Sequence, residues 1–202
     1  MNELLLLKEG ELTLKGLNRK NFEDFLINNL KRKLKPYGDF SFSAAQSIVY
    51  VEPKSGGCDM DTAFELACKT FGAVGVSRAR ACAKDKDAIT ECAKSFLRNE
   101  LLAASSFKVE SKRADKRFPM TSIELSQYVG GELAEAFPNV KVDVHNPELT
   151  VNAEVRDDFA YVHYTLAPTV SGRATLNGGS SKGAGGLPVG SSGRAVAMLS
   201  GG

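Results

Sequence analysis

The chain has 202 residues, enough for one large domain or two small ones, and two is the better initial estimate. A composition of 43% hydrophobic and 25% charged residues is that of a globular protein and argues against wholesale disorder. The net charge is only +2, no apolar stretch reaches the roughly 18 residues that a membrane helix needs, and the charges around residues 4–7 do not fit a signal peptide. We therefore expect a cytoplasmic protein with no membrane partner.

Alternating and helical hydrophobic patterns place six elements in the first part of the chain. They come in the order strand, helix, strand, strand, helix, strand: 3–8, 19–35, 40–42, 48–51, 61–70 and 74–82. Pro36 and Gly38 end the first helix, and either Asp61 or Thr62 would cap the second. This order is that of the ferredoxin-like, split βαβ arrangement, so residues 1–80 are predicted to form a first, ferredoxin-like domain.

A second set of elements follows in residues 81–168. The pattern predicts a helix, a strand, a second helix and three strands: 85–104, 107–114, 121–136, 140–144, 149–155 and 159–165. Thr121 and Glu124 form a T-x-x-E capping box at the start of the second helix. Gly130 and Gly131 lie inside that helix at a cost of roughly 1 kcal/mol each, which indicates close backbone contact with a neighbouring strand or a ligand. These residues are predicted to form a compact α/β domain.

The cysteines lie 10, 14 and 10 residues apart, so none forms a C-x-x-C pair: Cys58, Cys68, Cys82 and Cys92. The two histidines of the sequence, His145 and His163, are distant from one another and lie in strand-like stretches. Neither a zinc site nor a disulfide framework is therefore expected, and the natural interpretation is four thiols in a reducing cytosol. Each histidine is interpreted as a structural residue rather than a base.

Charged residues also cluster in the turn after the first strand. Glu9 and Glu11 with Lys15 and Arg19 are either an acid–base set or, as is far commoner, exposed charges in a turn. The sequence supports neither a Ser–His–Asp nor a Cys–His site, so no catalytic residue and no metal ligand is assigned in this chain.

Basic residues concentrate in residues 108–119, KVESKRADKRFP, where five cations accompany two carboxylates. Guanidinium and ammonium groups neutralise phosphates, and an aromatic ring can stack on an unpaired base. The alternative is a solvated strand edge with Phe118 in the core. A second basic cluster lies near the junction of the two predicted domains. Together the clusters supply the predicted nucleic-acid-binding residues: Lys112, Arg113, Lys116, Arg117, Phe118, Arg78, Arg80 and Lys84.

The last 34 residues differ from the rest, because 16 of them are Gly or Ser. Residues 169–193 are predicted to be a Gly/Ser-rich linker. Residues 194–199 (RAVAML) suit a buried strand. The three residues after it form either the entrance to a phosphate-binding loop or an ordinary glycine turn: Ser200, Gly201 and Gly202.

Several long blocks of the sequence resemble one family. GELTLKGLNRKNFEDFL (10–26) is similar to the opening signature of the tRNA 4-thiouridine synthases, also called thiamine-biosynthesis sulfurtransferases. KRADKRFPMTSIELSQYVGGEL (112–133) and NPELTVNAEVRDDFAYV (146–162) resemble their THUMP domain. GAGGLPVGSSGR (183–194) resembles the segment that leads into their third domain, and VAMLSGG (196–202) resembles the start of its SGG-x-D-S PP-loop.

The resemblance implies a mixed α+β and α/β chain: a ferredoxin-like domain, a THUMP domain and, at residues 194–202, a stub of a PP-loop α/β domain. In that family the first two domains bind tRNA, with THUMP at the 3′ acceptor end. The third domain uses ATP with Mg to adenylate a uridine, and sulfur comes through a cysteine desulfurase; some members also supply sulfur for thiamine. Ser200, Gly201 and Gly202 would be the first three PP-loop positions. The resemblance therefore predicts a chain that binds tRNA but neither binds ATP productively nor catalyses alone, and homodimerisation stays open.

Two features qualify the resemblance. Residues 169–182 look like an insertion, because the family joins its last THUMP strand to the GGLPVG segment by only a few residues. A THUMP module of another tRNA-modifying enzyme, a methyltransferase or a deaminase, is the alternative. The SGG that follows GGLPVG favours the sulfurtransferase.

Overall fold

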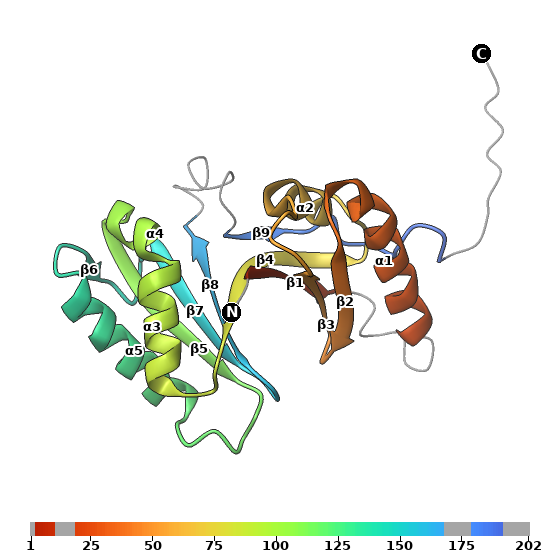
Figure 1. Cartoon of the computed structure of the whole chain (residues 1–202). Coiled ribbons are helices and arrows are strands. Elements are labelled where there is room, and N and C mark those ends of the chain that lie inside the picture. Colours follow the sequence, from red (N-terminus) through yellow and green to blue (C-terminus); the bar gives the residue numbers. More distant parts are fainter. Residues whose placement is uncertain (1–2, 11–18, 168–178, 192–202) are drawn as a thin grey trace, which may run out of the picture.

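The computed structural model describes residues 3–10, 19–167 and 179–191, which form helices and strands in nearly the predicted order (Figure 1). In chain order these are β1 Glu3–Glu9, α1 Arg19–Leu34, the 3₁₀ turn η3 Lys35–Tyr37, β2 Phe40–Ala45, β3 Ile48–Pro53, α2 Met60–Cys68, β4 Ala73–Cys82, α3 Lys86–Phe96, α4 Arg98–Ala103, β5 Ser106–Arg113, α5 Ser122–Ala136, β6 Lys141–Val142, β7 Leu149–Val155, β8 Ala160–Leu166 and β9 Ser180–Lys182.

The strands form one continuous sheet in the order β2-β3-β1-β4-β8-β7-β5-β6, with β9 also paired to β4. Each neighbouring pair among the first four strands is antiparallel, and together with α1 and α2 these strands have the predicted ferredoxin-like connectivity. In the second half, β5 and β7 are parallel and α5 lies between them in the chain, whereas β7 and β8 form an antiparallel hairpin. The long strand β4 pairs with β1 and, through its last three residues, with β8. β4 therefore joins the two halves.

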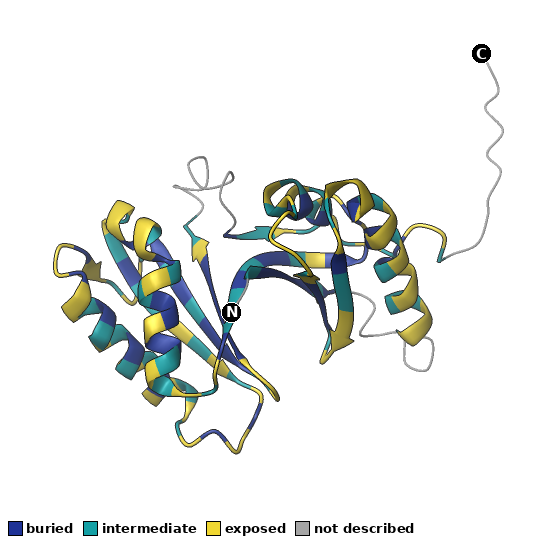
Figure 2. Cartoon of the chain, in the orientation of Figure 1, coloured by how far each residue is buried: buried dark blue, intermediate teal, exposed yellow. Residues whose placement is uncertain are grey.

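The helices lie on the outer side of this bent sheet, and its helix-free face lines the concave side (Figure 1). Each half has its own core beneath its helices, seen as the buried strands and helix faces in Figure 2. In the first core, Leu26, Leu30 and Leu34 repeat every four residues along α1 and are fully buried.

The leucines of β1 are buried on both faces of the sheet. Leu5 and Leu7 belong to the core under α1 and α2. Leu4 and Leu6 belong to a third cluster, which also contains Tyr50 of β3 and Tyr161 of β8. This third cluster packs the concave faces of the two halves against each other, and burial of each leucine contributes about 1.5–3 kcal/mol.

The predicted helix boundaries hold with two corrections. The N-cap of α2 is Asp59, whose carboxylate accepts the amide of Thr62 at 3.0 Å, and neither Asp61 nor Thr62 is the cap. The helix predicted over 85–104 is two helices, because the fully buried Leu97 lies between α3 and α4 with non-helical backbone angles. The capping box of Thr121 and Glu124 at the start of α5 is confirmed.

Other expectations for the second half were only partly correct. The strand predicted over 140–144 is reduced to two residues, because the Asp143 carboxylate accepts the amides of His145 and Asn146 and turns the chain. A Cβ on Gly130 would meet Val109 of β5 at an ordinary 3.7 Å, and a Cβ on Gly131 would meet no atom within 4 Å among the described residues. The expected close contact with a neighbouring strand is therefore not present at Gly131 among the described residues, and contact with a ligand stays a prediction.

Part of the predicted linker is an ordered strand. β9 pairs with Gly75–Ser77 of β4, and the amides of Gly183 and Gly185 donate to the carbonyls of Val74 and Ala73 at 3.0 and 2.8 Å. The side-chain amide of Asn29 donates to the carbonyl of Val189, which fixes the segment to α1. Residues 179–191 thus extend the sheet of the first half. The predicted strand at 194–199 and the predicted phosphate loop at Ser200, Gly201 and Gly202 lie outside the described residues.

Candidate nucleic-acid interface

Three connections meet at one end of the second half of the sheet: residues 83–85 after β4, residues 114–121 after β5, and residues 156–159 between β7 and β8. We call these residues the loop end. The amide of Ala114 donates to the carbonyl of Val155 at 2.8 Å, which holds two of the connections together. Six of the predicted nucleic-acid-binding residues lie within the loop end or next to it: Lys84, Lys112, Arg113, Lys116, Arg117 and Phe118.

A buried carboxylate organises the cations of the loop end. Asp115, which is 6% exposed, accepts from Lys84 Nζ at 2.6 Å and from Arg117 Nε and Nη2 at 2.9 and 3.2 Å. Hydrogen bonds from Arg117, then from Lys84, hold the pKa of Asp115 well below its usual range. Lys84 also donates to the backbone carbonyl of Asp157. The Asp115 carboxylate therefore holds Lys84 and Arg117 in place, and Lys84 in turn links the two connections to the turn at Asp157.

Two of the predicted residues shape the loop instead of facing solvent. Arg113 Nη1 donates to the carbonyls of Phe118 and Met120, both at 3.2 Å, and so closes the loop after β5. Phe118 is only 5% exposed and belongs to the core of this half. The prediction that Phe118 stacks on a base is therefore wrong, and the alternative, a core phenylalanine, is correct.

The exposed cations are Lys112, Lys116 and Arg117. The Arg117 side chain is 80% exposed even though its guanidinium is held by Asp115. Lys112 and Lys116 are exposed and form no ion pair with any described residue. Lys112 stands on the helix-free face of β5, opposite Glu154 in the register of β5 and β7. These three side chains can each meet a phosphate without first breaking a buried contact.

The arginines of β4 are engaged elsewhere. Arg78 Nε donates to Glu3 at 2.7 Å, and its guanidinium also pairs with Asp61 of α2. Arg80 Nη2 lies 3.2 Å from Glu3, and its guanidinium carbon lies 4.5 Å from the ring centre of Phe96. The second basic cluster is thus divided: Lys84 joins the loop end, and the two arginines tie β1 and the helices to β4.

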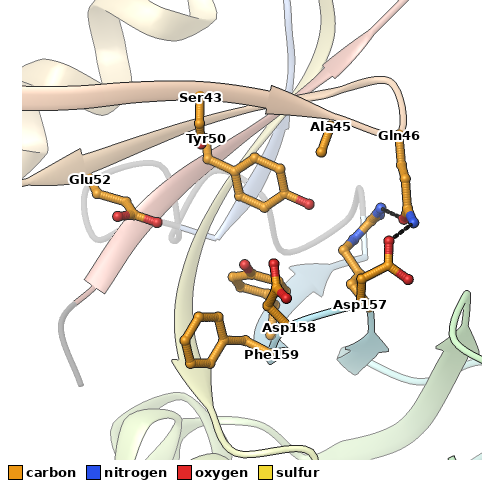
Figure 3. Close-up of a pocket in the computed structure, with 10 residues that line it drawn as sticks. Ser43, Ala45, Gln46, Tyr50, Glu52, Asp157, Asp158 and Phe159 are labelled. Atoms are coloured by element: carbon orange, nitrogen blue, oxygen red, sulfur yellow. Dashed lines mark hydrogen bonds between the residues drawn. The ribbon is translucent and has the colours of Figure 1, made fainter.

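A pocket adjoins the loop end on the concave side, and it was missed by the sequence analysis (Figure 3). Gln46, in the turn between β2 and β3, accepts a hydrogen bond from Arg156 Nη1 at 3.2 Å and donates to the Asp157 carboxylate. Gln46 and Ser47 both have positive φ, 50° and 64°, which is unusual for residues other than glycine. The two hairpin turns therefore meet across the pocket, and the only sequence signal was the charged RDD of the β7–β8 turn.

Behind the pocket lies a buried polar network. Glu154 accepts from Lys8 Nζ at 3.1 Å and from Arg156 Nη2 at 2.6 Å, and it lies 3.3 Å from His163 Nε2. His163 Nδ1 lies 3.0 Å from Ser180 Oγ of β9. The network connects β1, β7, β8 and β9, so His163 is structural, as predicted.

The protonation states in this network follow from burial and charge. Burial lowers the pKa of His163, so its imidazole is neutral and donates Nε2–H to Glu154. Burial alone would raise the pKa of Glu154, but His163, Arg156 and Lys8 outweigh burial and hold the pKa well below its usual range. An anionic Glu154 thus joins the two halves of the sheet.

The predicted acid–base set after β1 is partly described. Glu9 has a fully buried side chain and pairs with Arg19 Nη2 at 3.1 Å, and Arg19 Nε lies 2.6 Å from Glu23. Burial, followed by the nearby charge of Glu23, raises the pKa of Glu9 to about 7. This pair joins the end of β1 to the start of α1 and is not the exposed turn that was expected. Glu11 and Lys15 lie outside the described residues.

Comparison with family models divides the chain as its two cores do. A ThiI ferredoxin-like domain matches residues 4–77, and a THUMP domain matches residues 83–164. Residues 4–77 thus form a ThiI ferredoxin-like domain, and residues 83–164 form a THUMP domain. The predicted family resemblance and mixed α+β fold are thereby confirmed. The loop end, with its exposed cations, belongs to the THUMP domain and to the connection that leads into it.

Relatives agree with this assignment. The chain is 37% identical to a probable tRNA sulfurtransferase of Caldanaerobacter subterraneus subsp. tengcongensis and 36% identical to one of Acetivibrio thermocellus, in both cases over all of this chain and 48% of the relative. A crystal structure of a 4-thiouridine synthetase–RNA complex with bound ATP shares the fold, with a TM-score of 0.77 and 24% identity over all of this chain and 47% of that one. The chain thus spans about half the length of these proteins. No helix among the described residues is long and apolar enough to cross a membrane.

Proposed function

We propose that this chain is the tRNA-binding N-terminal portion of a cytoplasmic tRNA sulfurtransferase that makes 4-thiouridine. The observation that carries the proposal is the group of exposed cations on the loop end of the THUMP domain: Lys112, Lys116 and Arg117. Asp115 holds Arg117 in place, so this guanidinium has lost part of its conformational freedom before any phosphate binds.

In this proposal the two domains have different roles in tRNA binding. Residues 81–168 would contact the 3′ acceptor end of tRNA, and residues 1–80 would support them through β4 and the Glu154 network. ATP with Mg, the cysteine desulfurase and any role in thiamine synthesis would concern the part of the enzyme that begins near Ser200, outside the described residues. Binding and catalysis would then reside in different parts of one protein.

Salt-dependent tRNA binding tests this proposal. The variant Lys112→Ala/Lys116→Ala removes two cations that form no ion pair with any described residue, so the fold should be unaffected. We expect weaker binding of tRNA and a slope of log affinity against log salt that is shallower by about 1–2, since each lost phosphate contact removes roughly 0.7–0.9. Fluorescence anisotropy of labelled tRNA at several salt concentrations measures both quantities.

A matched pair of lysines serves as the control. Lys35 follows α1, and Lys141 lies in β6 opposite Ser106, at the far end of β5 from the loop end. Lys35→Ala/Lys141→Ala changes the net charge equally and should leave the salt slope within error of the unmodified chain. Equal losses in the two double variants would mean that tRNA responds only to overall charge, and the proposed site would be abandoned.

A further inference from the structure

Residues 179–191, which we call the strap, follow the edge of β4 that also pairs with β8. β8 pairs with the last three residues of β4 and β9 pairs with Gly75–Ser77 on the same edge, whereas β1 occupies the opposite edge. Between these two pairings, Arg78 and Ala79 have no strand partner on this edge among the described residues. Figure 1 shows β4 curving from one domain into the other. The strap therefore lies beside the place where the two domains join.

The strap is attached mainly to the first domain, and weakly. Besides the pairing of β9, the amides of Gly183 and Gly185 donate to β4 carbonyls, and a carbonyl near the end of the strap accepts from Asn29 of α1. No strap residue is among the buried core residues of the part of the chain that the structure describes, and Leu187 is only partly buried against the first core. A segment that buries so little apolar surface opens at a lower free-energy cost than the domains themselves.

The Ser180 hydroxyl connects the strap to the THUMP domain. Ser180 Oγ lies 3.0 Å from His163 Nδ1 of β8 and 2.7 Å from Ser77 Oγ of β4. Within the described ranges no other hydrogen bond joins the strap to the THUMP domain. The preceding Gly179 passes so close to β8 that a Cβ there would lie 2.8 Å from the ring of Tyr164. Ser180 is thus held between one strand of each domain.

His163 fixes the direction of the hydrogen bonds at Ser180. Because His163 donates Nε2–H to Glu154, its Nδ1 carries a lone pair and accepts from the Ser180 hydroxyl. The Ser180 oxygen in turn accepts from the hydroxyl of Ser77. Glu154 also binds Lys8 of β1. The hydrogen bonds therefore run from the strap through the THUMP domain and back to the first domain, and removal of the Ser180 hydroxyl interrupts them.

We propose that the strap is a releasable lock on the angle between the two domains, with Ser180 as its positioning residue. When the strap is docked, Ser180 holds His163 of β8 next to Ser77 of β4, beside the two β4 residues that have no partner on that edge. When the strap is released, β4 can bend at those two residues while both domain cores stay intact. The domain angle then depends on a segment that leaves the sheet without unfolding either domain.

The test measures strap release and domain orientation on the 202-residue chain without RNA. Trypsin cleavage after Lys182 reports release, and residual dipolar couplings of backbone amides, fitted separately for residues 19–77 and 86–164, report orientation. One alignment tensor should fit both domains of the unmodified chain. Ser180→Ala should raise the cleavage rate about fivefold, the effect of losing one hydrogen bond, and the two domains should then need different tensors. Ser180→Thr keeps the hydroxyl and should restore both readouts.

The matched control is Ser181→Ala in the same strand. The Ser181 hydroxyl is hydrogen bonded to Cys68 of α2, in the first domain, so its loss should leave one tensor for both domains. A second variant, Gly183→Ala, releases the strap by a clash with the backbone of Ala73 and should separate the two tensors as Ser180→Ala does. Amide spectra should show that both domains remain folded in every variant.

Three outcomes would overturn the inference. Faster cleavage of Ser180→Ala and Gly183→Ala with one tensor for both domains would show that the strap does not hold the domain angle. Unchanged cleavage of both variants, or two tensors already in the unmodified chain, would show that no lock is present. Separate tensors in Ser181→Ala would show that the link to His163 has no special role. Because no measurement uses RNA, failure of the chain to bind tRNA would contradict the proposed function and leave this inference standing.

Discussion

Asp115 and Lys84 form an ion pair of 2.6 Å between two connections that are thirty-one residues apart in the chain. Lys84 follows β4, the strand shared by both domains, and Asp115 follows β5 in the THUMP domain. The pair therefore fixes the cationic loop relative to the strand that joins the domains. Arg117 completes the arrangement, because the same carboxylate accepts its Nε at 2.9 Å.

The first prediction is that Asp115→Asn destabilises the chain at neutral pH and has little effect in acid. The folded-state pKa of Asp115 lies below its unfolded value of about 3.9, so its stabilising contribution is present above that value and is lost as the pH falls through the folded-state pKa. The melting temperature of the variant should therefore lie below that of the unmodified chain at pH 7, and the gap should close toward pH 2. A gap that persists unchanged in acid would show that charge at Asp115 does not organise the loop.

The second prediction concerns Phe118, which the sequence analysis had placed in contact with RNA. Its burial predicts that Phe118→Ala costs about 3–5 kcal/mol of unfolding free energy, as for other core phenylalanines. Urea unfolding measures this cost, and Phe159→Ala, at an exposed phenylalanine of the same loop end, is the matched control with a much smaller loss. A Phe118→Ala variant as stable as the unmodified chain would return Phe118 to the list of RNA contacts.

Sequence patterns were sufficient for the order of elements but not for the assignment of side chains to the site. Hydrophobic spacing located β1, α1 and the capping box of α5 because these depend on residues close together in the chain. The role of Phe118 depends on Leu125 and Val155, which share its core, and that of Arg113 on carbonyls of the following loop. A basic stretch has the same composition whether its cations face solvent or close a loop.

The pocket and β9 illustrate the same limit at longer range. Gln46 and Asp157 are 111 residues apart, and Ser77 and Ser180 are 103 residues apart, yet each pair is hydrogen bonded. Glycine-rich composition predicted a linker for residues 169–193, which include β9, since composition does not report that β4 offers an unpaired edge. Pairings of this kind become visible only in the folded chain, because they join residues that are far apart in the sequence.

The third prediction is that Glu9 makes the chain less stable as the pH rises. Burial raises its folded-state pKa to about 7, above the ordinary value of 4.5 for a glutamate, so its stabilising contribution is fully present below pH 4.5 and is lost as the pH rises through 7. Glu9→Gln mimics the protonated form and should exceed the unmodified chain in stability by about 1–3 kcal/mol at pH 8, with no gain at pH 4. Urea unfolding of both chains at the two pH values provides the comparison, and a gain at pH 4 of the same size would contradict the assignment.

The fourth prediction compares alanine substitutions at two glycines, Gly183 and Gly131. A Cβ on Gly183 would lie 2.2 Å from the carbonyl oxygen of Ala73 and 2.7 Å from its carbon, and neither backbone atom can move without opening the pairing of β9 with β4. Gly183→Ala should therefore cost about 1–3 kcal/mol and expose Lys182 to trypsin. A Cβ on Gly131 meets no described atom within 4 Å, so Gly131→Ala in α5 should stabilise the chain by roughly 0.5–1 kcal/mol and leave cleavage at Lys182 unchanged. Equal effects of the two substitutions on unfolding and on proteolysis would show that β9 is not docked on β4, because only the docked strand makes Gly183 indispensable.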